Sequence, residues 1–336
     1  MARPRLLVLA GEALFRSFFD PPRRRRLSRR FDWRRRSERA LTPRLRAALA
    51  DAEALVTTWD SPRLGLDLER LAPRLRAIAH CGGEVKGRFA GPLFERFVIT
   101  NAPGPMAPCV AELAVAFALH AVRRIDAYRE ALRRPSNRVY SDLHLHGGGE
   151  ETLRERTVGI VGFGRIGRAV AERLRPFGPR LLVHDPFASA AAVRRQGARR
   201  VRLDPLLRAS HVLILAAALT DATRGLLDAR RLAHLRDGAT VVNVARGGLV
   251  DLEALTREVR RGRLTCALDV TDPAEPLPLR HPLRRLRGAV VTPHVGAAAG
   301  AVRRAMADLV LGDLERVFQG TRPRNRVTPG MLDRMT

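Results

Sequence analysis

Short apolar runs alternate with amphipathic stretches between residues 5 and 100 of the chain. The runs that suit buried strands lie at residues 6–9, 54–57, 77–79 and 97–100. Between them, apolar residues recur at helical spacing, as at 41–49 and 64–71. Strands that alternate with helices are typical of a parallel sheet. The pattern therefore predicts a first α/β unit.

The same alternation returns after residues 101–108, a connector rich in proline and glycine. Strand-like apolar runs follow at 158–161, 181–184, 212–215, 240–244, 265–270 and 289–292. Six such runs, separated by helical patterns, predict a doubly wound parallel sheet. We therefore expect a second domain over residues 104–296.

A glycine motif opens this second sheet, in the segment Thr157-Val-Gly-Ile-Val-Gly-Phe-Gly-Arg-Ile-Gly167. Gly162 allows a tight turn, Gly164 lets the backbone approach a pyrophosphate, and Gly167 lets a helix pack on the strand. The next apolar run closes on Asp185, where such folds place a ribose-binding carboxylate. The motif predicts a Rossmann dinucleotide-binding domain, against the alternative of a glycine turn without a ligand.

Two helical patterns flank the second sheet. Residues 109–134 are apolar on most of the predicted helix surface, so we expect this helix to be buried between domains or subunits. Residues 301–318 form another helix, which would return the chain to the first unit. Residues 1–103 and 297–336 then make one discontinuous domain. The predicted fold class is α/β, with two doubly wound parallel-sheet domains and the Rossmann domain inserted into a flavodoxin-like one.

The charge of the chain points to polyanions, but its distribution does not. The formal net charge is +27, yet Lys86 is the only lysine and arginines lie on every predicted helix. A biased codon supply explains this better than selection for one phosphate-binding face. The densest run, residues 23–36, predicts a solvated helix and an edge strand, with a basic binding patch as the alternative. We expect no specific nucleic-acid partner, and only weak, salt-sensitive binding to DNA.

Cysteine usage and hydropathy bear on the location of the protein. Cys81, Cys109 and Cys266 are odd in number and scattered, which favours a reducing compartment and therefore the cytoplasm. No apolar run approaches the length of a membrane span, so we expect no membrane partner. His144 and His146 lie in a glycine-rich segment, and two ligands on a loop are too few for a metal site. We expect no bound metal.

Three segments carry side chains suited to chemistry, each at a predicted strand end where ligands of parallel sheets bind. Arg246 follows an apolar strand and precedes two glycines; its guanidinium can grip a carboxylate and polarise a carbonyl, although it is one arginine among many. Asp269 ends the next strand, and Glu275 lies in the proline-rich loop beyond it. His294 follows the last strand. A histidine beside a carboxylate can exchange the proton that carbonyl reduction requires.

With these motifs in this order, essentially the whole chain resembles the D-isomer-specific 2-hydroxyacid dehydrogenase family, whose members use NAD or NADP. The resemblance implies that Arg246 orients the substrate, that Glu275 partners the histidine, and that His294 is the general acid/base. It also implies that the discontinuous domain binds substrate and that the backbone around Gly82 and Gly83 receives the substrate carboxylate. The residues implied to line the dinucleotide are Gly162, Gly164, Arg165, Ile166, Gly167, Asp185, Thr220, Ala245 and Asp269, the last at the nicotinamide amide.

The expected activity is hydride transfer between NAD(H) and a small 2-oxo acid or D-2-hydroxy acid, carried out by a homodimer. Asp185 favours NAD over NADP because its charge repels a 2′-phosphate. Two alternatives remain, namely a non-catalytic NAD-sensing interaction protein of the same fold and a nucleic-acid-binding protein. An intact set of Arg246, Glu275 and His294 counts against the first, and the second rests on charge alone.

The chain departs from the family's pattern in three places. Asp269 and Glu275 are six steps apart where five are usual, which leaves Asp272 as an alternative partner for the histidine. Residues 216–218 are alanines where many relatives have His-x-Pro, which would loosen the loop on the cofactor side. Lys86 stands where the substrate loop commonly carries Asp. It either pairs with a second anionic group of the substrate, or faces solvent or offsets Glu84.

Overall fold

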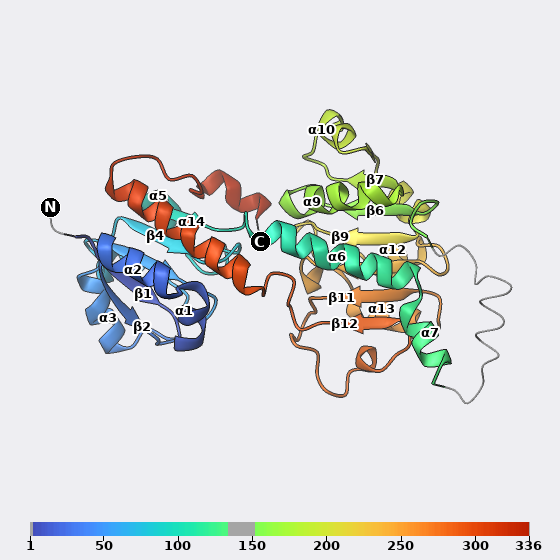
Figure 1. Ribbon diagram of the computed structural model, residues 1–336, viewed down its shortest axis with the longest axis horizontal. Coiled ribbons are helices and arrows are strands. Elements are labelled where there is room, and N and C mark those ends of the chain that lie inside the picture. The colour runs from blue at the N-terminus through green and yellow to red at the C-terminus, as the bar shows by residue number, and fades with distance from the viewer. Residues whose placement is uncertain (1–2, 134–151, 336) are drawn as a thin grey trace. The chain divides into compact units, whose positions relative to one another are not determined.

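The computed structural model describes residues 3–133 and 152–335 of the chain (Figure 1). Two compact units result, one made of Met1–Met106 and Ala297–Thr336 and the other of Ala107–Gly296. Each unit has a parallel sheet of its own. The first is called the discontinuous unit and the second the continuous unit.

The discontinuous unit is built on a five-stranded parallel sheet with the order β2-β1-β3-β4-β5. The strands are β1 (Arg5–Leu9), β2 (Asp32–Arg36), β3 (Ala54–Thr57), β4 (Ala77–His80) and β5 (Val98–Asn101). The order 2-1-3-4-5 is that of flavodoxin-like sheets, as predicted. All four residues of β3 and of β4 are buried, because helices cover both faces of the sheet.

Helices on the two faces of this sheet pack against alternate residues of each strand. On one face lie α1 (Glu12–Phe18), α2 (Pro21–Arg30) and α14 (Gly300–Phe318). On the other face lie α3 (Pro43–Ala50), α4 (Leu68–Leu71) and α5 (Leu93–Arg96). A 3₁₀ turn, η4 (Pro329–Arg334), follows α14 near the end of the chain. Leu6 and Val8 of β1 join the core of the first face, whereas Leu7 and Leu9 join that of the second. Because α14 follows the continuous unit in sequence, it returns the chain to this sheet.

The continuous unit contains a seven-stranded parallel sheet with the order β12-β11-β10-β9-β6-β7-β8. Its strands are β6 (Thr157–Val161), β7 (Arg180–His184), β8 (Ala198–Arg200), β9 (Val212–Leu215), β10 (Thr240–Asn243), β11 (Thr265–Leu268) and β12 (Ala289–Val291). Counted from β6, this is the Rossmann order extended by one strand, with the switch point between β6 and β9. The predicted fold class is confirmed, but six strands were expected where the structure has seven. The missed β8 has two exposed arginines in three residues, so it lacks an apolar signal.

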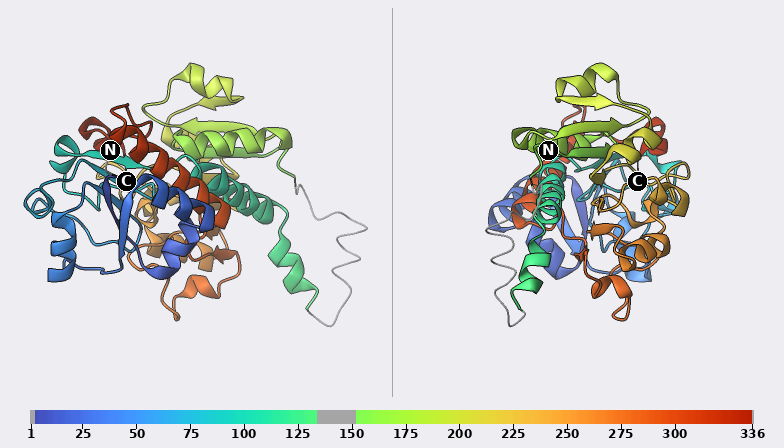
Figure 2. Two further views of the ribbon diagram at one scale, coloured as in Figure 1. Left: turned by 60° about the vertical axis from the view of Figure 1, so that its left-hand side comes forward. Right: turned by 90° about the vertical axis from the view of Figure 1, so that its right-hand side faces the viewer.

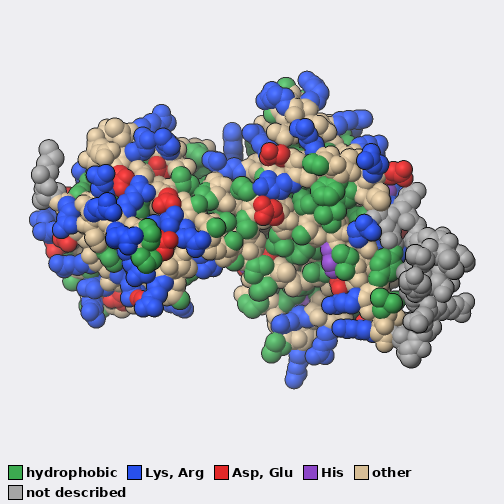
Figure 3. Space-filling view, in the orientation of Figure 1, with side chains coloured by type: hydrophobic (Ala, Val, Ile, Leu, Met, Phe, Trp, Pro, Cys, Tyr) green, Lys and Arg blue, Asp and Glu red, His purple; other side chains and the backbone are tan. Residues whose placement is uncertain are grey.

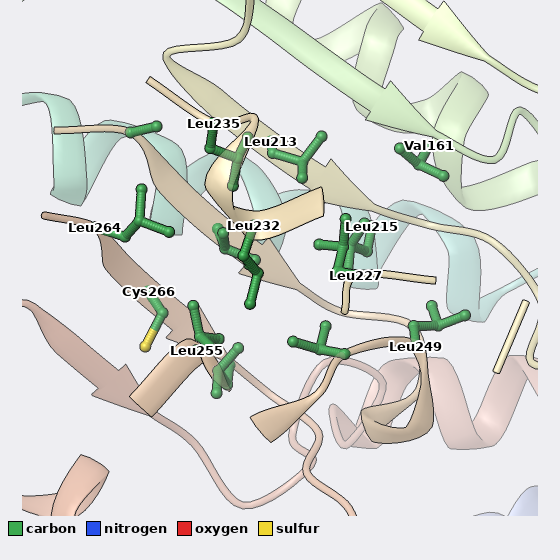
Figure 4. Packing of buried hydrophobic residues seen from close by; sticks show 14 of the residues in the cluster. Val161, Leu213, Leu215, Leu227, Leu232, Leu235, Leu249, Leu255, Leu264 and Cys266 are labelled. Carbon is green, nitrogen blue, oxygen red and sulfur yellow. The ribbon is translucent and has the colours of Figure 1, made fainter. Parts of the chain in front are cut away.

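Helices cover both faces of the second sheet as well. The helices are α6 (Met106–Val122), α7 (Ile125–Ala131), α9 (Arg165–Leu174), α10 (Ala190–Arg195), α11 (Leu203–Ala209), α12 (Ala229–Ala233) and α13 (Leu252–Arg260), with 3₁₀ turns at Arg175–Phe177, Gly247–Leu249 and Pro282–Arg284. On one face, α11, α12 and α13 enclose a leucine-rich core with the strands (Figure 4). Helices α6 and α9 run side by side (Figure 2). An ion pair links them, with Nη2 of Arg173 in α9 lying 3.6 Å from Oε1 of Glu112 in α6.

The prediction of a single helix over residues 109–134 is wrong. The structure breaks it into α6 and α7 at Arg124, whose φ of +49° is left-handed and interrupts the helical hydrogen bonds. The expected burial holds for one side of α6, but α7 has no buried residue. Within the described residues, no single helix is long and apolar enough to cross a membrane; only the pair α6 and α7, bent by 47°, reaches that length together.

The arginine-rich run at residues 23–36 forms α2 and the edge strand β2, as predicted. Several of its charges are neutralised locally: Arg26 donates to both carboxylate oxygens of Glu315 at 2.8 Å, and Arg23 pairs with Asp20 and Asp308. Lys and Arg side chains are spread over the visible faces of both units rather than gathered in one patch (Figure 3). This distribution favours a general arginine bias over one nucleic-acid surface.

Candidate active site

The glycine motif forms the turn between β6 and α9. Gly162 has a φ of +91°, and a Cβ there would lie 2.5 Å from the Cα of Ala217. A Cβ on Gly167 would lie 2.1 Å from the carbonyl oxygen of Gly162, so the helix can pack this close only without a side chain. At Gly164 a Cβ would meet nothing within 4 Å, which leaves the backbone open to a ligand.

The start of α9 suits an anionic group. Gly164 is the N-cap and offers no side chain to accept from the first-turn amides, which have no intrahelical partner. Arg165 is exposed at the first helical position, Ile166 is half-buried beside it, and Gly167 is buried. The unpaired amides and the positive end of the helix dipole match the charge of a pyrophosphate. These residues therefore fit a bound dinucleotide.

Asp185 follows β7 and closes the same turn. Its Oδ2 accepts from the Phe163 amide at 2.6 Å, and its Oδ1 accepts from the amides of Phe187 and Ala188 at 2.7 and 2.9 Å. The carboxylate thus joins the glycine turn to the end of β7. Oδ2 keeps a lone pair, which a ribose hydroxyl can use.

The other residues implied for the cofactor lie at the ends of β9 and β10. Thr220 caps a turn in which its amide donates to the Thr223 hydroxyl at 2.8 Å. The alanine loop before it was expected to be loose, but the Ala216 amide donates to the carbonyl of Val161 at 2.8 Å and the Thr223 hydroxyl donates to that of Ala218 at 2.7 Å. Ala245 is buried. A backbone hydrogen bond and the Thr223 hydroxyl thus hold the alanine loop.

Arg246, Glu275 and His294 follow three neighbouring strands of one sheet. Strand β10 leads to Arg246, β11 to the loop that carries Glu275, and β12 to His294. The sheet order β12-β11-β10 and the parallel pairing place these three strand ends along one edge. This edge is where ligands of doubly wound sheets bind.

The turn that carries Arg246 is held by Asn243, a residue that the sequence analysis did not single out. The Asn243 side-chain amide donates to the carbonyl of Arg246 at 2.9 Å, and its Oδ1 accepts from the Ala245 amide at 3.0 Å. Gly247 follows, and a Cβ there would lie 2.1 Å from the carbonyl carbon of Thr271. The missing side chain therefore lets the Arg246 turn pack against the loop that carries Glu275. The sequence offered one sign of this role, because Asn243 is a polar residue at the end of an apolar strand, shortly before two glycines.

Glu275 and His294 contact each other directly. The Nδ1 of His294 hydrogen-bonds to Oε1 of Glu275, while Oε2 accepts from the Thr271 amide at 3.4 Å. The side chains of His294 and Glu275 are 47% and 36% exposed, so the pair is reachable from solvent. The additional step between Asp269 and Glu275 is absorbed by the loop. Among the described residues Asp272 makes no contact with the histidine, so Glu275 is the carboxylate that the structure places there.

Asp269 organises the turn on which His294 stands. Its Oδ1 accepts from the Thr292 hydroxyl and the Val295 amide at 2.5 and 2.8 Å, and its Oδ2 accepts from the Gly296 amide at 2.9 Å. The Asp269 backbone carbonyl accepts from the His294 amide. His294 has a φ of +55°, which costs about 1–3 kcal/mol outside glycine and persists only when its surroundings impose it. The family resemblance implied a place for Asp269 at the nicotinamide amide, and nothing in the sequence predicted this positioning role.

Asp269→Asn is expected to destabilise this turn. In the native protein both carboxylate oxygens accept hydrogen bonds, whereas the NH₂ group of asparagine would face one of these donors and leave it without an acceptor. The unpaired donor costs about 1–3 kcal/mol, and we expect a comparable loss in the free energy of unfolding together with a lower kcat. Urea unfolding and steady-state kinetics measure the two effects. Asp272→Asn, on the exposed loop nearby, is the matched control. Unchanged stability and kcat would show that the three contacts of Asp269 do not hold the histidine.

Gly82 and Gly83 lie in the discontinuous unit, directly after β4. The carbonyl of Gly82 accepts from the Ala102 amide at 2.9 Å, and that of Gly83 accepts from the Asn101 side chain at 2.7 Å. Their own amides donate to no group within residues 3–133 and 152–335. Two neighbouring unpaired amides at a strand end form a site for a carboxylate.

Two residues beneath this loop are buried and uncharged. Burial lowers the pKa of His80 to about 3, so its ring is neutral at any working pH. Its Nδ1 hydrogen-bonds to the Thr57 hydroxyl at 2.9 Å, and its Nε2 would lie 2.2 Å from a Cβ on Gly82. Burial also raises the pKa of the Cys81 thiol, which keeps it from acting as a nucleophile. The glycine loop therefore rests on packing and not on a charged base.

Lys86 is exposed on the same loop. Glu84 is occupied by other groups: its Oε1 accepts from the Gly87 amide at 2.7 Å, and its Oε2 lies 3.7 Å from Nε of Arg88. The structure thus pairs Glu84 with Arg88, not with the lysine. No group of three or more metal-binding side chains occurs in the described parts of the chain, and His144 and His146 lie outside them.

Comparison with known proteins agrees with this geometry. Residues 115–296 match the family model of the D-isomer specific 2-hydroxyacid dehydrogenase, NAD binding domain. A glyoxylate reductase from Aeropyrum pernix is 34% identical over 282 residues, which cover 82% of this chain and 83% of that protein.

Solved structures extend the similarity to both units. The TT0316 protein from Thermus thermophilus is similar with a TM-score of 0.77 and 32% identity, covering 96% of this chain and 100% of that one. An NADPH-dependent glyoxylate/hydroxypyruvate reductase from Sinorhizobium meliloti gives a TM-score of 0.76 and 26% identity, covering 99% and 98%. The chain therefore belongs to the D-isomer specific 2-hydroxyacid dehydrogenases, which are NAD(P)-dependent oxidoreductases.

Proposed function

We propose that the protein interconverts a small 2-oxo acid and its D-2-hydroxy acid with NAD(H), using His294 as general acid/base and Arg246 to orient the substrate. The contact between His294 and Glu275 carries the proposal. It joins an ionisable ring to a carboxylate at the sheet edge where Arg246 also stands. The continuous unit is the NAD-binding domain in this proposal, and the discontinuous unit binds the substrate.

His294 handles the proton. With Nδ1 bonded to Glu275, the Nε2 atom is left to give a proton to the carbonyl oxygen in reduction or to take it from the hydroxyl in oxidation. The carboxylate fixes the tautomer that exposes Nε2. Asp269 holds the backbone of His294 in the orientation this requires.

Arg246 and the glycine loop hold the substrate. A guanidinium binds a carboxylate through two parallel hydrogen bonds and polarises the adjacent carbonyl. On the discontinuous unit, the unpaired amides of Gly82 and Gly83 suit the charge of a substrate carboxylate. NAD, when bound at the Gly162–Gly167 turn and Asp185, supplies or accepts the hydride. The protein residues thus fix the geometry of the acid and the path of the proton.

The direct test is to mix the protein with NADH and a panel of 2-oxo acids and to follow absorbance at 340 nm. Oxidation of NADH by at least one acid is the expected result. A non-catalytic sensor of the same fold would bind NADH without consuming it. Binding of NADH with no turnover across the panel would therefore overturn the proposal and favour the sensor.

Asp185 leads us to expect a preference for NAD(H) over NADP(H), because its charge repels a 2′-phosphate. Asp185→Ala should lower kcat/KM for NADH by about ten-fold or more, since it removes charge-assisted hydrogen bonds to the ribose, and should affect NADPH less. Kinetics with both cofactors at fixed substrate measure the difference. Arg200→Ala is a control for the neighbourhood, because Arg200 donates to the carbonyls of Asp185 and Pro186. Equal efficiency of the native protein with NADH and NADPH would contradict the assignment.

A homodimer and a cytoplasmic location complete the proposal. Helix α7 has no buried residue, and Ile125 and Leu132 are 50% and 63% exposed. A second copy would cover these side chains. Light scattering should give twice the chain mass of 37.2 kDa, and Ile125→Glu should favour the monomer. A monomer at micromolar concentration would contradict this.

No disulfide joins Cys81, Cys109 and Cys266, which suits a reducing compartment.

A further inference from the structure

Trp59 lies beside the glycine loop of the discontinuous unit. Its indole Nε1 would be 3.0 Å from a Cβ on Gly82, so the ring edge faces the loop. The other side of the ring packs on Phe18, with ring centroids 5.2 Å apart. The guanidinium of Arg88 holds the backbone of residues 58 and 59, because it donates to the carbonyls of Thr58 and Trp59 at 3.1 and 2.8 Å. The indole is therefore fixed next to the two free amides.

Arg303, on the first turn of α14, covers the same ring. Its guanidinium carbon is 5.5 Å from the Trp59 ring centroid. Its Nε is buried and makes no hydrogen bond, and its side chain has no ion pair within the described parts of the chain. The adjacent Arg304 differs, because it lies 4.0 Å from the Asp20 carboxylate. Arg303 is thus a cation held by stacking, with donors to spare.

Trp59 and Arg303 supply hydrogen-bond donors beside Gly82, and the nearby acids are engaged elsewhere. Asp60 accepts from the Gly11 amide and the Thr58 hydroxyl, at 2.9 and 2.5 Å. Glu84 accepts from the Gly87 amide. No hydrogen bond of the Trp59 indole N–H is found among residues 3–133 and 152–335. The neutral ring of His80 also faces Gly82, and its Nε2 donates when Nδ1 accepts from the Thr57 hydroxyl. An indole N–H and a guanidinium with no carboxylate between them are complementary to an anion.

The donors exceed what one carboxylate can use. A carboxylate has about four lone-pair sites. The amides of Gly82 and Gly83 take two of them. Arg303 carries five N–H donors and Trp59 one, which is more than the two remaining sites can accept. Lys86 adds a further positive charge on the same loop.

We propose that Arg303 and Trp59 form a subsite for a second anionic group, so that the preferred substrate is a 2-oxo acid bearing a second carboxylate or a phosphate. This inference rests on the proposed function for the assignment of the first carboxylate to the glycine loop. The Nη–H groups of Arg303 and the indole N–H of Trp59 bind the second anion. Lys86 strengthens the field without making a required contact.

Kinetics with substrates of equal length test the subsite. We compare 2-oxoglutarate with 2-oxopentanoate, and 3-phosphohydroxypyruvate with hydroxypyruvate, each with NADH. Arg303→Met keeps an apolar side chain over the indole and removes the charge. It should lower kcat/KM for the preferred dianionic acid by about ten-fold or more, mainly through KM, and change the monoanionic values less than about two-fold. Trp59→Phe keeps a ring and removes the N–H, so it should act in the same direction but less.

Arg304→Met is the matched control, since it removes a neighbouring arginine that faces Asp20. It should leave the ratio between dianionic and monoanionic acids unchanged. The pair of acids that shows the larger ratio tells whether carboxylate or phosphate occupies the subsite. Equal losses for both classes in Arg303→Met, or a native protein that does not favour either dianion, would overturn the inference while leaving the dehydrogenase activity in place.

Calorimetry in the presence of NAD⁺ tests the subsite without turnover. At least one of 2-oxoglutarate and 3-phosphohydroxypyruvate should bind at least about ten-fold more tightly than its monoanionic partner, and Arg303→Met should remove the difference. Equal affinities, or no binding of either dianion, would overturn the inference. If no acid is reduced in any assay, the proposed function fails, and this binding difference still decides whether the subsite exists.

Discussion

His294→Ala is expected to lower kcat for 2-oxo acid reduction by about 10²–10⁴-fold while NADH binding stays within a few-fold. The loss follows because His294 would exchange the proton through its Nε2, and no other group described at this sheet edge replaces it. The cofactor contacts that we propose lie at the Gly162–Gly167 turn and Asp185, at the ends of other strands. Steady-state kinetics and a fluorescence titration with NADH measure the two quantities.

His281→Ala is the matched control for this experiment. His281 belongs to the same unit and only caps a short 3₁₀ turn, accepting from the Leu283 amide at 3.3 Å. Its replacement should leave kcat within about two-fold, the range of a surface substitution that removes one weak cap. Retention of more than about a tenth of the native activity by His294→Ala would remove His294 from the mechanism.

Glu275→Gln is expected to lower kcat by about ten-fold or more, both for 2-oxo acid reduction and for hydroxy acid oxidation. The carboxylate holds Nδ1 of His294, and a hydrogen bond to a charged group contributes about 1.5–3 kcal/mol. Glutamine keeps the size of the side chain but not its charge, so the ring is held less firmly in the orientation that leaves Nε2 to the substrate. Steady-state kinetics in both directions measure the loss of kcat, and a fluorescence titration should show that NADH binding stays within a few-fold.

Asp272→Asn is the control for Glu275→Gln, because it removes a carboxylate three residues earlier in the same loop. Its kcat should stay within about two-fold of the native value, the range of a surface substitution. If Asp272→Asn lowers kcat and Glu275→Gln does not, the pairing of Glu275 with His294 does not operate in the reaction.

The apolar pattern predicted the central strands well, because residues buried on both faces leave continuous apolar runs in the sequence. Strands β3 and β9 lie over the very residues expected, and β4 agrees within one residue. The pattern failed at β8, an edge strand that pairs on one side only and carries two arginines. It also predicted a longer helix where α4 is confined to Leu68–Leu71. Strand β8 is formed by its pairing with β7, which leaves little trace in the local sequence.

The break between α6 and α7 shows the same limit from another side. The apolar pattern of residues 109–134 continues past Arg124 without a glycine or proline to mark the interruption. A left-handed residue at this point reflects the backbone that the fold requires, not a local preference of arginine.

By itself, the sequence determined the glycine turn, the strand ends that carry Arg246 and His294, and the return of the last helix, because these depend on local residue chemistry and chain order. Only the tertiary structure decided that Asp269 organises the histidine turn and that Glu275, not Asp272, meets the ring. It alone brought Arg303 onto Trp59, from positions 244 residues apart. Hydrogen bonds and stacking act over a few ångströms in space, and separation along the chain does not limit which groups they join.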